Sequence, residues 1–170
     1  MALGSKFIFT TNIFLMTHWI KQIGLSQPAL RIPETEKCDY IRTVDFSEIP
    51  DRIKIGDQLF IYAVGHQYLY AHLEVLSIPF EGHPEEFASG ARNKDYPWLL
   101  LCRNLDKGFS DQWFERKINL LESARQYHNE TGKLVTSPGA ANLNGLMAGN
   151  SYIGLQPEFA QYLLQKMSKL

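Results

Sequence analysis

Cysteine and clustered histidine are scarce in this 170-residue sequence. The two cysteines, Cys38 and Cys102, lie far apart and lack the spacing of metal ligands, which favours reduced thiols in a cytosolic protein over a disulfide. The five histidines form no HxH, no HxxxH and no Cys-His cluster; they are His18, His66, His72, His83 and His128. His66 and His72 flank an expected tight turn, but histidines on a strand pair are more often structural than metal ligands. The sequence therefore predicts no metal ion and no cofactor.

Positive charge is not in excess either. The chain has 17 Lys and Arg against 18 Asp and Glu, which gives a formal net charge of -1 and a pI of about 6.5. The charges are scattered rather than gathered in blocks. A tight nonspecific binder of DNA needs an extended basic surface. Any nucleic-acid binding must therefore come from a local patch and a pocket.

No hydrophobic run is long enough to cross a membrane. Residues 7–15 are apolar, but Thr10, Thr11 and Asn12 interrupt them, and no small-residue cleavage site follows. We therefore expect no membrane partner and a cytoplasmic location.

Motifs for phosphate binding and nucleophilic catalysis are also missing. There is no GxxxxGK and no GxGxxG, so nucleotide hydrolysis is not expected. No serine or cysteine has a general base beside it in sequence, although a triad assembled in space stays open. The paired carboxylates, Glu34 with Glu36 and Glu85 with Glu86, lie in polar stretches typical of solvated surface. We therefore predict that the protein is not an enzyme.

Apolar and aromatic residues, by contrast, are plentiful. Hydrophobic residues make up 45% of the chain, enough to bury a core, and the length fits one domain over residues 1–170. Aromatic residues make up 12% of the chain. Several of them lie at the ends of expected strands rather than in the middle of an apolar stripe, namely Tyr40, Tyr62, Tyr96 and Trp98. Flat aromatic faces stack on an extruded or single-stranded base, which is worth about 1–3 kcal/mol per base.

The strongest local signal is a β-hairpin in the middle of the chain. Gly56-Asp57 is a turn dipeptide that leads into an uninterrupted apolar run at 59–64. A short polar turn at 65–67 and a β-rich run at 68–78 follow. This stretch predicts the centre of a small sheet, with the first strand buried on both faces.

Other segments of the sequence predict further strands and helices around this hairpin. We predict further strands at 6–12, 96–105 and 151–155, and helices at 16–23, at 111–127 and from Pro157 onward. Helical spacing of Met16, Trp19, Ile20 and Ile23 places Trp19 in the core rather than in a binding site. In the last helix, an apolar stripe predicted to pack on the sheet comprises Phe159, Leu163, Met167 and Leu170.

Three long irregular segments, at 26–54, 79–95 and 137–150, separate these elements. Such loops are unusual in a compact domain unless they carry function. The second is either a solvated crossover or a basic edge that touches phosphate through Arg92 and Lys94. The third holds three Gly and three Asn. It forms either simple turns or the wall of a pocket, in which the Asn side-chain amides would form hydrogen bonds with the edge of a base.

Several motifs, in this order and spacing, resemble an EVE-type domain. They are the Gly56-Asp57 entry, Tyr62-Ala63-Val64-Gly65, Ala71-His72-Leu73-Glu74-Val75, Tyr96-Pro97-Trp98 and the closing Ser151-Tyr152-Ile153-Gly154-Leu155. EVE-type domains belong to the PUA-like barrels, with YTH and ASCH domains as relatives. The resemblance, which extends over nearly the whole chain, implies an α+β fold, a PUA-like mixed β-barrel with flanking short helices.

The same resemblance implies a noncatalytic module that recognises a modified base in DNA or RNA. The residues predicted for the base pocket are Asn12, Tyr40, Tyr62, Trp98 and Asn142, and those predicted to hold phosphates are Arg42, Arg92 and Lys94. Tyr40 and Arg42 are the nearest counterparts of the aromatic and basic residues at the family's pocket mouth, where the expected Trp is absent.

Two other functions stay open at this point. One is an ASCH-like RNA hydrolase with a general base such as His66. The other is a small-molecule or protein-interaction domain, which the neutral charge favours. Neither the type of nucleic acid nor the oligomeric state follows from the sequence.

Overall fold

The computed structural model describes residues 16–23, 41–64, 67–82, 95–106, 118–137, 139–140, 143 and 152–170. Its strands are β1 (His18–Ile23), β2 (Ile41–Phe46), β3 (Gln58–Ala63), β4 (Tyr68–Val75), β5 (Phe80–Glu81), β6 (Trp98–Asn104), β7 (Thr136–Ser137) and β8 (Tyr152–Leu155). Its helices are α2 (Leu120–Thr131) and α3 (Pro157–Ser168). Within the described residues, no helix is long and apolar enough to cross a membrane.

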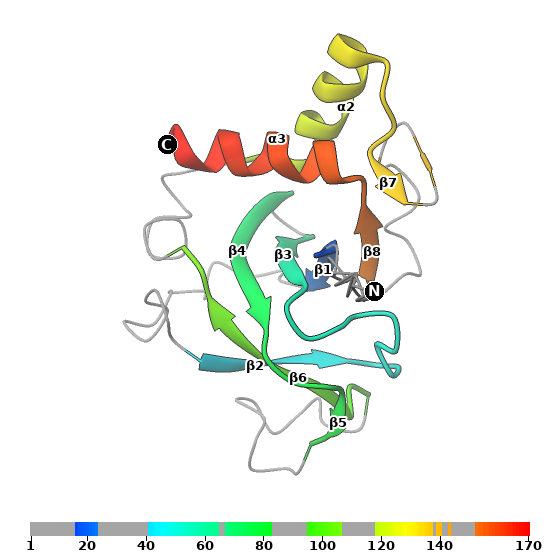
Figure 1. Ribbon diagram of the computed structural model, residues 1–170, viewed down its shortest axis with the longest axis vertical. Helices are drawn as coiled ribbons and strands as arrows, with labels where there is room; N and C mark the ends of the chain where they lie inside the picture. Colours follow the sequence, from blue (N-terminus) through cyan, green and yellow to red (C-terminus); the bar gives the residue numbers. More distant parts are fainter. Residues whose placement is uncertain are drawn as a thin grey trace, which may run out of the picture.

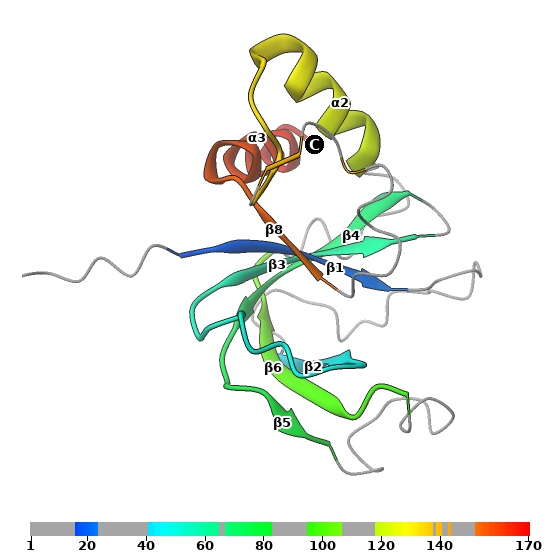
Figure 2. The same cartoon turned by 90° about the vertical axis from the view of Figure 1, so that its right-hand side faces the viewer.

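The strands form one curled sheet. Their order is β2-β6-β4-β3-β1-β8-β7, and β5 pairs with β6. Strands β1 and β3 are parallel, and the other pairs are antiparallel. Although β2 and β8 lie near opposite ends of this order, the rings of Phe46 and Tyr152 approach to 5.9 Å between centroids. The sheet therefore curls into an open barrel, while α2 and α3 lie together on the side away from β2, β5 and β6 (Figures 1 and 2).

The central hairpin is confirmed. Strands β3 and β4 are antiparallel, the Gln67 amide donates a hydrogen bond to the Ala63 carbonyl oxygen, and β3 is almost entirely buried. Phe60 and Tyr62 point to a core beneath the helices, whereas Leu59 and Ile61 point into the barrel. The Gly56-Asp57 turn also holds, because Gly56 adopts a φ of 89°, a backbone conformation that residues with a side chain rarely take.

The predicted helix at 16–23 is wrong, because this segment contains β1. The apolar spacing there fits a helix, but the chain instead pairs with β3 on one side and β8 on the other. A central strand is buried on both faces, so its apolar residues do not alternate with polar ones. The sequence pattern alone therefore does not distinguish such a strand from a helix. Met16, part of the supposed stripe, is 43% exposed, whereas Trp19 is in the core as predicted.

Two of the predicted loops contain strands. Strand β2 lies within 26–54 and pairs with β6 along its whole length, and β5 lies within 79–95. Both strands depend on pairing with β6, a distant segment, so local composition did not reveal them. The strands predicted at 96–105 and 151–155 are confirmed as β6 and β8. The strand predicted at 6–12 lies outside the described residues, as does most of 137–150.

The helices begin and end on local signals. The Asn119 side chain caps α2 by accepting a hydrogen bond from the Glu122 amide, and Gly132 ends it in the left-handed conformation. This helix therefore runs farther than the predicted end at Tyr127, and residues 111–117 lie outside the described residues. Helix α3 starts at Pro157 as predicted, and it buries Phe159, Leu163 and Met167. Leu170 is half-exposed and is not part of that stripe.

Two clusters divide the core between the two faces of the sheet. The helix-side core joins α2 and α3 to the sheet, and its members include Ile20, Phe60, Tyr62, Leu69, Phe159 and Leu163. The barrel-side core fills the curl of the sheet, and its members include Trp19, Phe46, Ile61, Tyr70, Leu73 and Cys102. Cys102 is a free thiol, and burial raises its pKa to about 12, whereas Cys38 lies outside the described residues.

Candidate functional site

A buried lysine lies where the curled sheet closes. Lys21 points from β1 into the barrel and is only 3% exposed. Its Nζ donates a hydrogen bond of 2.7 Å to the carbonyl oxygen of Gln22. The same nitrogen lies 5.0 Å from the ring centre of Phe46 and 6.0 Å from that of Tyr96. A cation held against aromatic faces is attracted by their electron density, which partly offsets its loss of hydration.

Burial lowers the pKa of the Lys21 amine, because a charged group is disfavoured away from water. The negative charge of Asp45 acts in the opposite direction. Within the described residues, the hydrogen bond to Gln22 is the only one that Nζ makes, and no carboxylate forms an ion pair with it. An ammonium has three N–H donors. The site therefore holds a buried donor group with unused hydrogen-bonding capacity.

Partly exposed aromatic residues surround this lysine. Trp98 is the register partner of Phe46 across β6 and β2, so their side chains are neighbours on one face. Tyr152 is the register partner of Lys21 and packs edge-on against Phe46 and Trp19. Tyr96, Trp98 and Tyr152 are each half-buried. We call Lys21, Phe46, Tyr96, Trp98 and Tyr152 the Lys21 cluster.

A buried carboxylate fixes the strand that carries Lys21. Asp57 accepts hydrogen bonds from the Thr17 amide (2.9 Å), the Trp19 indole Nε1 (2.8 Å) and the Lys54 amide (3.0 Å). The acceptor is only 5% exposed. The Arg52 guanidinium lies 5.1 Å from the Trp19 ring centre on the same side of the sheet. The Gly56-Asp57 turn thus orients β1, because it holds the residues on both sides of His18.

The structure places two of the residues predicted from sequence on the same face of the sheet and a third on the opposite face. Trp98 and Arg42 lie on the barrel-side face of neighbouring strands, since Arg42 pairs with Cys102 and its guanidinium lies 5.9 Å from the Tyr70 ring centre. Tyr62 is 3% exposed in the helix-side core and does not share their surroundings. The remaining predicted site residues lie outside the described residues; they are Asn12, Tyr40, Arg92, Lys94 and Asn142.

Two histidines are buried on the other face of the sheet. His72 stacks on Phe60 at 4.8 Å between ring centres and its Nε2 lies 2.7 Å from Gln58 Oε1. Burial, with a smaller effect from His18, lowers the pKa of His72 to about 3. Burial also lowers the pKa of His18, whose Nε2 is buried without a hydrogen-bond partner. No group of three or more His, Cys, Asp or Glu within the described part of the chain is placed to hold a metal ion.

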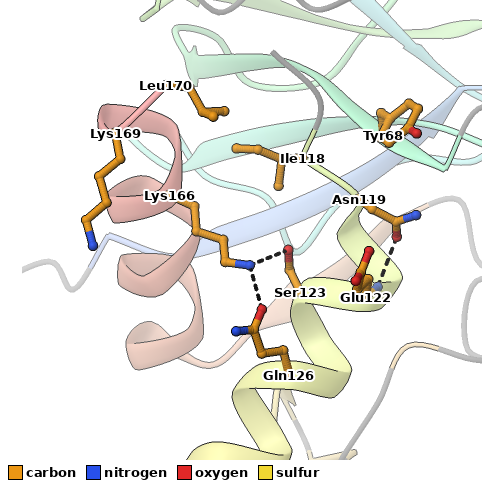
Figure 3. Close-up of a pocket in the computed structure, with 9 residues that line it drawn as sticks. All are labelled: Tyr68, Ile118, Asn119, Glu122, Ser123, Gln126, Lys166, Lys169 and Leu170. Carbon is orange, nitrogen blue, oxygen red and sulfur yellow. Dashed lines mark hydrogen bonds between the residues drawn. The ribbon is translucent and has the colours of Figure 1, made fainter. Parts of the chain in front are cut away.

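A groove of about 490 Å³ lies between the two helices and the start of β4. Figure 3 shows Lys166 reaching across it from α3 toward α2. Its Nζ lies 3.0 Å from Gln126 Oε1 and 3.4 Å from Ser123 Oγ. This lysine therefore already serves to tie the two helices together, unlike the one in the barrel.

The sequence did not point to Lys21, Phe46 or Tyr152 as site residues. Lys21 is a lone charge between Ile20 and Ile23, and it stands out only if the segment is recognised as a buried strand. Phe46 lies in a strand that the sequence did not predict. Four distant segments supply the Lys21 cluster, so its members become neighbours only once the sheet has closed.

Comparison with known proteins gives matches at the level of structure. No protein-family model matches the sequence, and no curated protein matches it. A structure of human THYN1 in complex with DNA that contains 5-methylcytosine has a TM-score of 0.53 at 12% identity, over 88% of this chain and 96% of that one. The DUF55 domain of human thymocyte nuclear protein 1 has a TM-score of 0.53 at 16% identity, over 88% and 98% of the two chains.

A hypothetical protein from Leishmania major is similar to the same extent, with a TM-score of 0.55 at 12% identity over 91% of this chain and 96% of that one. These matches extend over nearly all of each chain. The chain therefore shares the fold of these structures, which for the described residues is a mixed sheet with two helices, an α+β fold as the sequence predicts.

Proposed function

We propose that the protein is a noncatalytic nucleic-acid-binding module that recognises a modified base at the Lys21 cluster. The observation that carries this proposal is the set of half-buried aromatic rings, Tyr96, Trp98 and Tyr152, around a buried amine. Aromatic faces stack on an unpaired base, and a polar group beside them reads its edge. Human THYN1, which shares the fold, binds DNA containing 5-methylcytosine in the matched structure.

The near-neutral charge of the chain is compatible with this function. Phosphate contacts supply most nonspecific affinity for nucleic acid, whereas a base pocket supplies selectivity. Arg42 lies on the same face as Trp98, four residues along β2 from Phe46, which is about 13 Å in an extended strand. The shared face supports the inference that Arg42 holds a phosphate of a nucleic acid whose base stacks at the cluster.

The proposal is tested by fluorescence-detected binding to short matched oligonucleotides. These are unmodified, or carry methylated or hydroxymethylated cytosine or methylated adenine, and each is measured at two salt concentrations. We expect tighter binding to one modified oligonucleotide, weakened by salt. Equal and negligible binding to all of them would reject the proposal and favour a small-molecule or protein partner.

Trp98→Ala sharpens this test. Loss of one stacked base contact, about 1–3 kcal/mol, weakens binding about 5- to 150-fold. Because Trp98 is only partly buried, its removal should leave a cooperative thermal unfolding transition. Tyr68→Ala is the matched control, since Tyr68 is a part-exposed aromatic that lines the groove between the helices. Equal losses in the two variants would place binding elsewhere than at the Lys21 cluster.

A further inference from the structure

We propose that Lys21 determines which base the cluster accepts, by donating hydrogen bonds to two adjacent acceptor atoms of the base. The site then takes cytosine or guanine in preference to adenine or thymine. This inference rests on the proposed function and adds the class of base to it.

The first step of the argument is the count of donors. The Lys21 ammonium has three N–H groups and no acceptor. One N–H is used by the Gln22 carbonyl oxygen at 2.7 Å. The faces of Phe46 and Tyr96 lie 5.0 and 6.0 Å from the nitrogen and accept no conventional hydrogen bond. Within the part of the chain that the structure describes, two N–H groups therefore remain for a ligand.

The second step is the pattern of acceptors on each base. Cytosine has neighbouring acceptors at N3 and O2, and guanine has them at O6 and N7. Adenine has a donor amino group beside N7, and in thymine the N3–H donor separates O2 from O4. A group that only donates meets a donor on both of these bases. A buried donor that faces another donor has no hydrogen-bond partner, so its desolvation is not compensated. This cost disfavours binding of the wrong base.

The third step concerns the state of the base. The N3 and O2 atoms of cytosine are covered by pairing in a duplex, so Lys21 reaches them only in an unpaired or extruded base. The aromatic rings around Lys21 provide the stacking surface that such a base requires. A methyl group at C5 lies on the opposite edge of the ring and leaves the two contacts to Lys21 unchanged. The identity of the base and its modification are thus read by different parts of the site.

A purely structural role for Lys21 is the competing explanation. In that case the side chain only fills the barrel beside Phe46. Lys21→Met distinguishes the two roles, because methionine keeps an unbranched apolar side chain and removes the ammonium. Replacing a buried charge with an apolar group of similar size is often neutral or stabilising. We therefore expect an unfolding temperature equal to or above that of the wild-type protein.

The experiment measures binding of the full chain to four oligonucleotides that differ only in one unpaired base, placed opposite an abasic site. The wild-type protein is expected to bind the cytosine or guanine probe about 5- to 150-fold more tightly than the adenine probe. Lys21→Met should reduce this preference to within about threefold. Lys21→Arg, which keeps the donors, should retain it, and Lys166→Met is the control in the groove between the helices.

Each result decides between distinct conclusions. If the wild-type protein binds none of the probes, the proposed function fails, and the inference fails with it. If the wild-type protein binds but prefers adenine, or if Lys21→Met keeps the wild-type preference, only the role of Lys21 is overturned. The order of wild-type affinities tests the inference even if Lys21→Met does not fold.

Discussion

The two faces of the central sheet are buried in different ways. The helix-side core is closed by α2 and α3, whose buried residues pack aliphatic and aromatic side chains against β3 and β4. The barrel-side core is closed by the curl of the sheet itself. Its rim is made of half-buried aromatics and the exposed Arg52, and Lys21 is buried beside them. The helix-covered face also carries the groove between α2, α3 and β4, where Lys166 ties the two helices together. The face that closes on itself keeps polar groups next to half-buried rings, and it is the face proposed above to bind.

Buried polar groups sharpen this contrast. On the barrel side, Asp57 is satisfied by three donors. On the helix side, His72 has Gln58 as a partner, whereas His18 Nε2 has none. The stability of the barrel side should therefore depend on one carboxylate, that of Asp57. The stability of the helix side should depend on His18 and His72 remaining uncharged.

The largest effect is expected for Asp57→Ala. The substitution leaves the Trp19 indole and the amides of Thr17 and Lys54 without their acceptor, at a cost of about 3–5 kcal/mol in the free energy of unfolding. Urea denaturation followed by tryptophan fluorescence measures this loss. Glu48→Ala, an exposed carboxylate in the same region, should change stability by no more than about 0.5 kcal/mol. Similar small effects for both variants would show that Asp57 does not anchor β1.

The second-largest effect is expected from acid, which should destabilise the helix side. The pKa of His72 is lowered to about 3 in the folded protein, whereas a histidine in the unfolded chain titrates near its ordinary pKa of 6.5. Below pH 6.5 the unfolded chain therefore binds a proton that the folded chain does not, and stability falls as the pH falls. The loss attributed to His72 is about 2 kcal/mol between pH 7 and pH 5.

Urea denaturation at several pH values isolates this contribution. His72→Phe removes the titrating ring and keeps an aromatic group against Phe60. The slope of its unfolding free energy against pH should therefore be smaller than that of the wild-type protein, by an amount that corresponds to at most about one bound proton. His128→Phe alters a partly exposed histidine near the end of α2 and serves as the control. An unchanged pH dependence in His72→Phe would contradict a neutral, buried His72.

Locally encoded elements were predictable from the sequence, and elements defined by distant pairing were not. The Gly56-Asp57 turn and Pro157 carry their structure in their own backbone preferences. Strands β1 and β2 exist because β3, β8 and β6 pair with them, and nothing in residues 16–23 or 41–46 alone distinguishes them from helix or loop. The candidate site follows the same rule. Trp98 could be proposed from the sequence because it lies in a locally evident strand, whereas Lys21 becomes a candidate only when four strands are assembled.

The smallest effect is expected for Arg42, which tests whether nucleic acid crosses the barrel side. Each phosphate contact contributes about 0.7–0.9 to the slope of log K against log salt concentration. Arg42→Gln should reduce that slope by one contact and weaken all oligonucleotides about equally, because a phosphate contact carries no sequence information. Lys169→Gln, on the helix side, should leave the slope unchanged. If Lys169→Gln lowers the slope and Arg42→Gln does not, the nucleic acid follows the groove between the helices, and the assignment of binding to the barrel side is reversed.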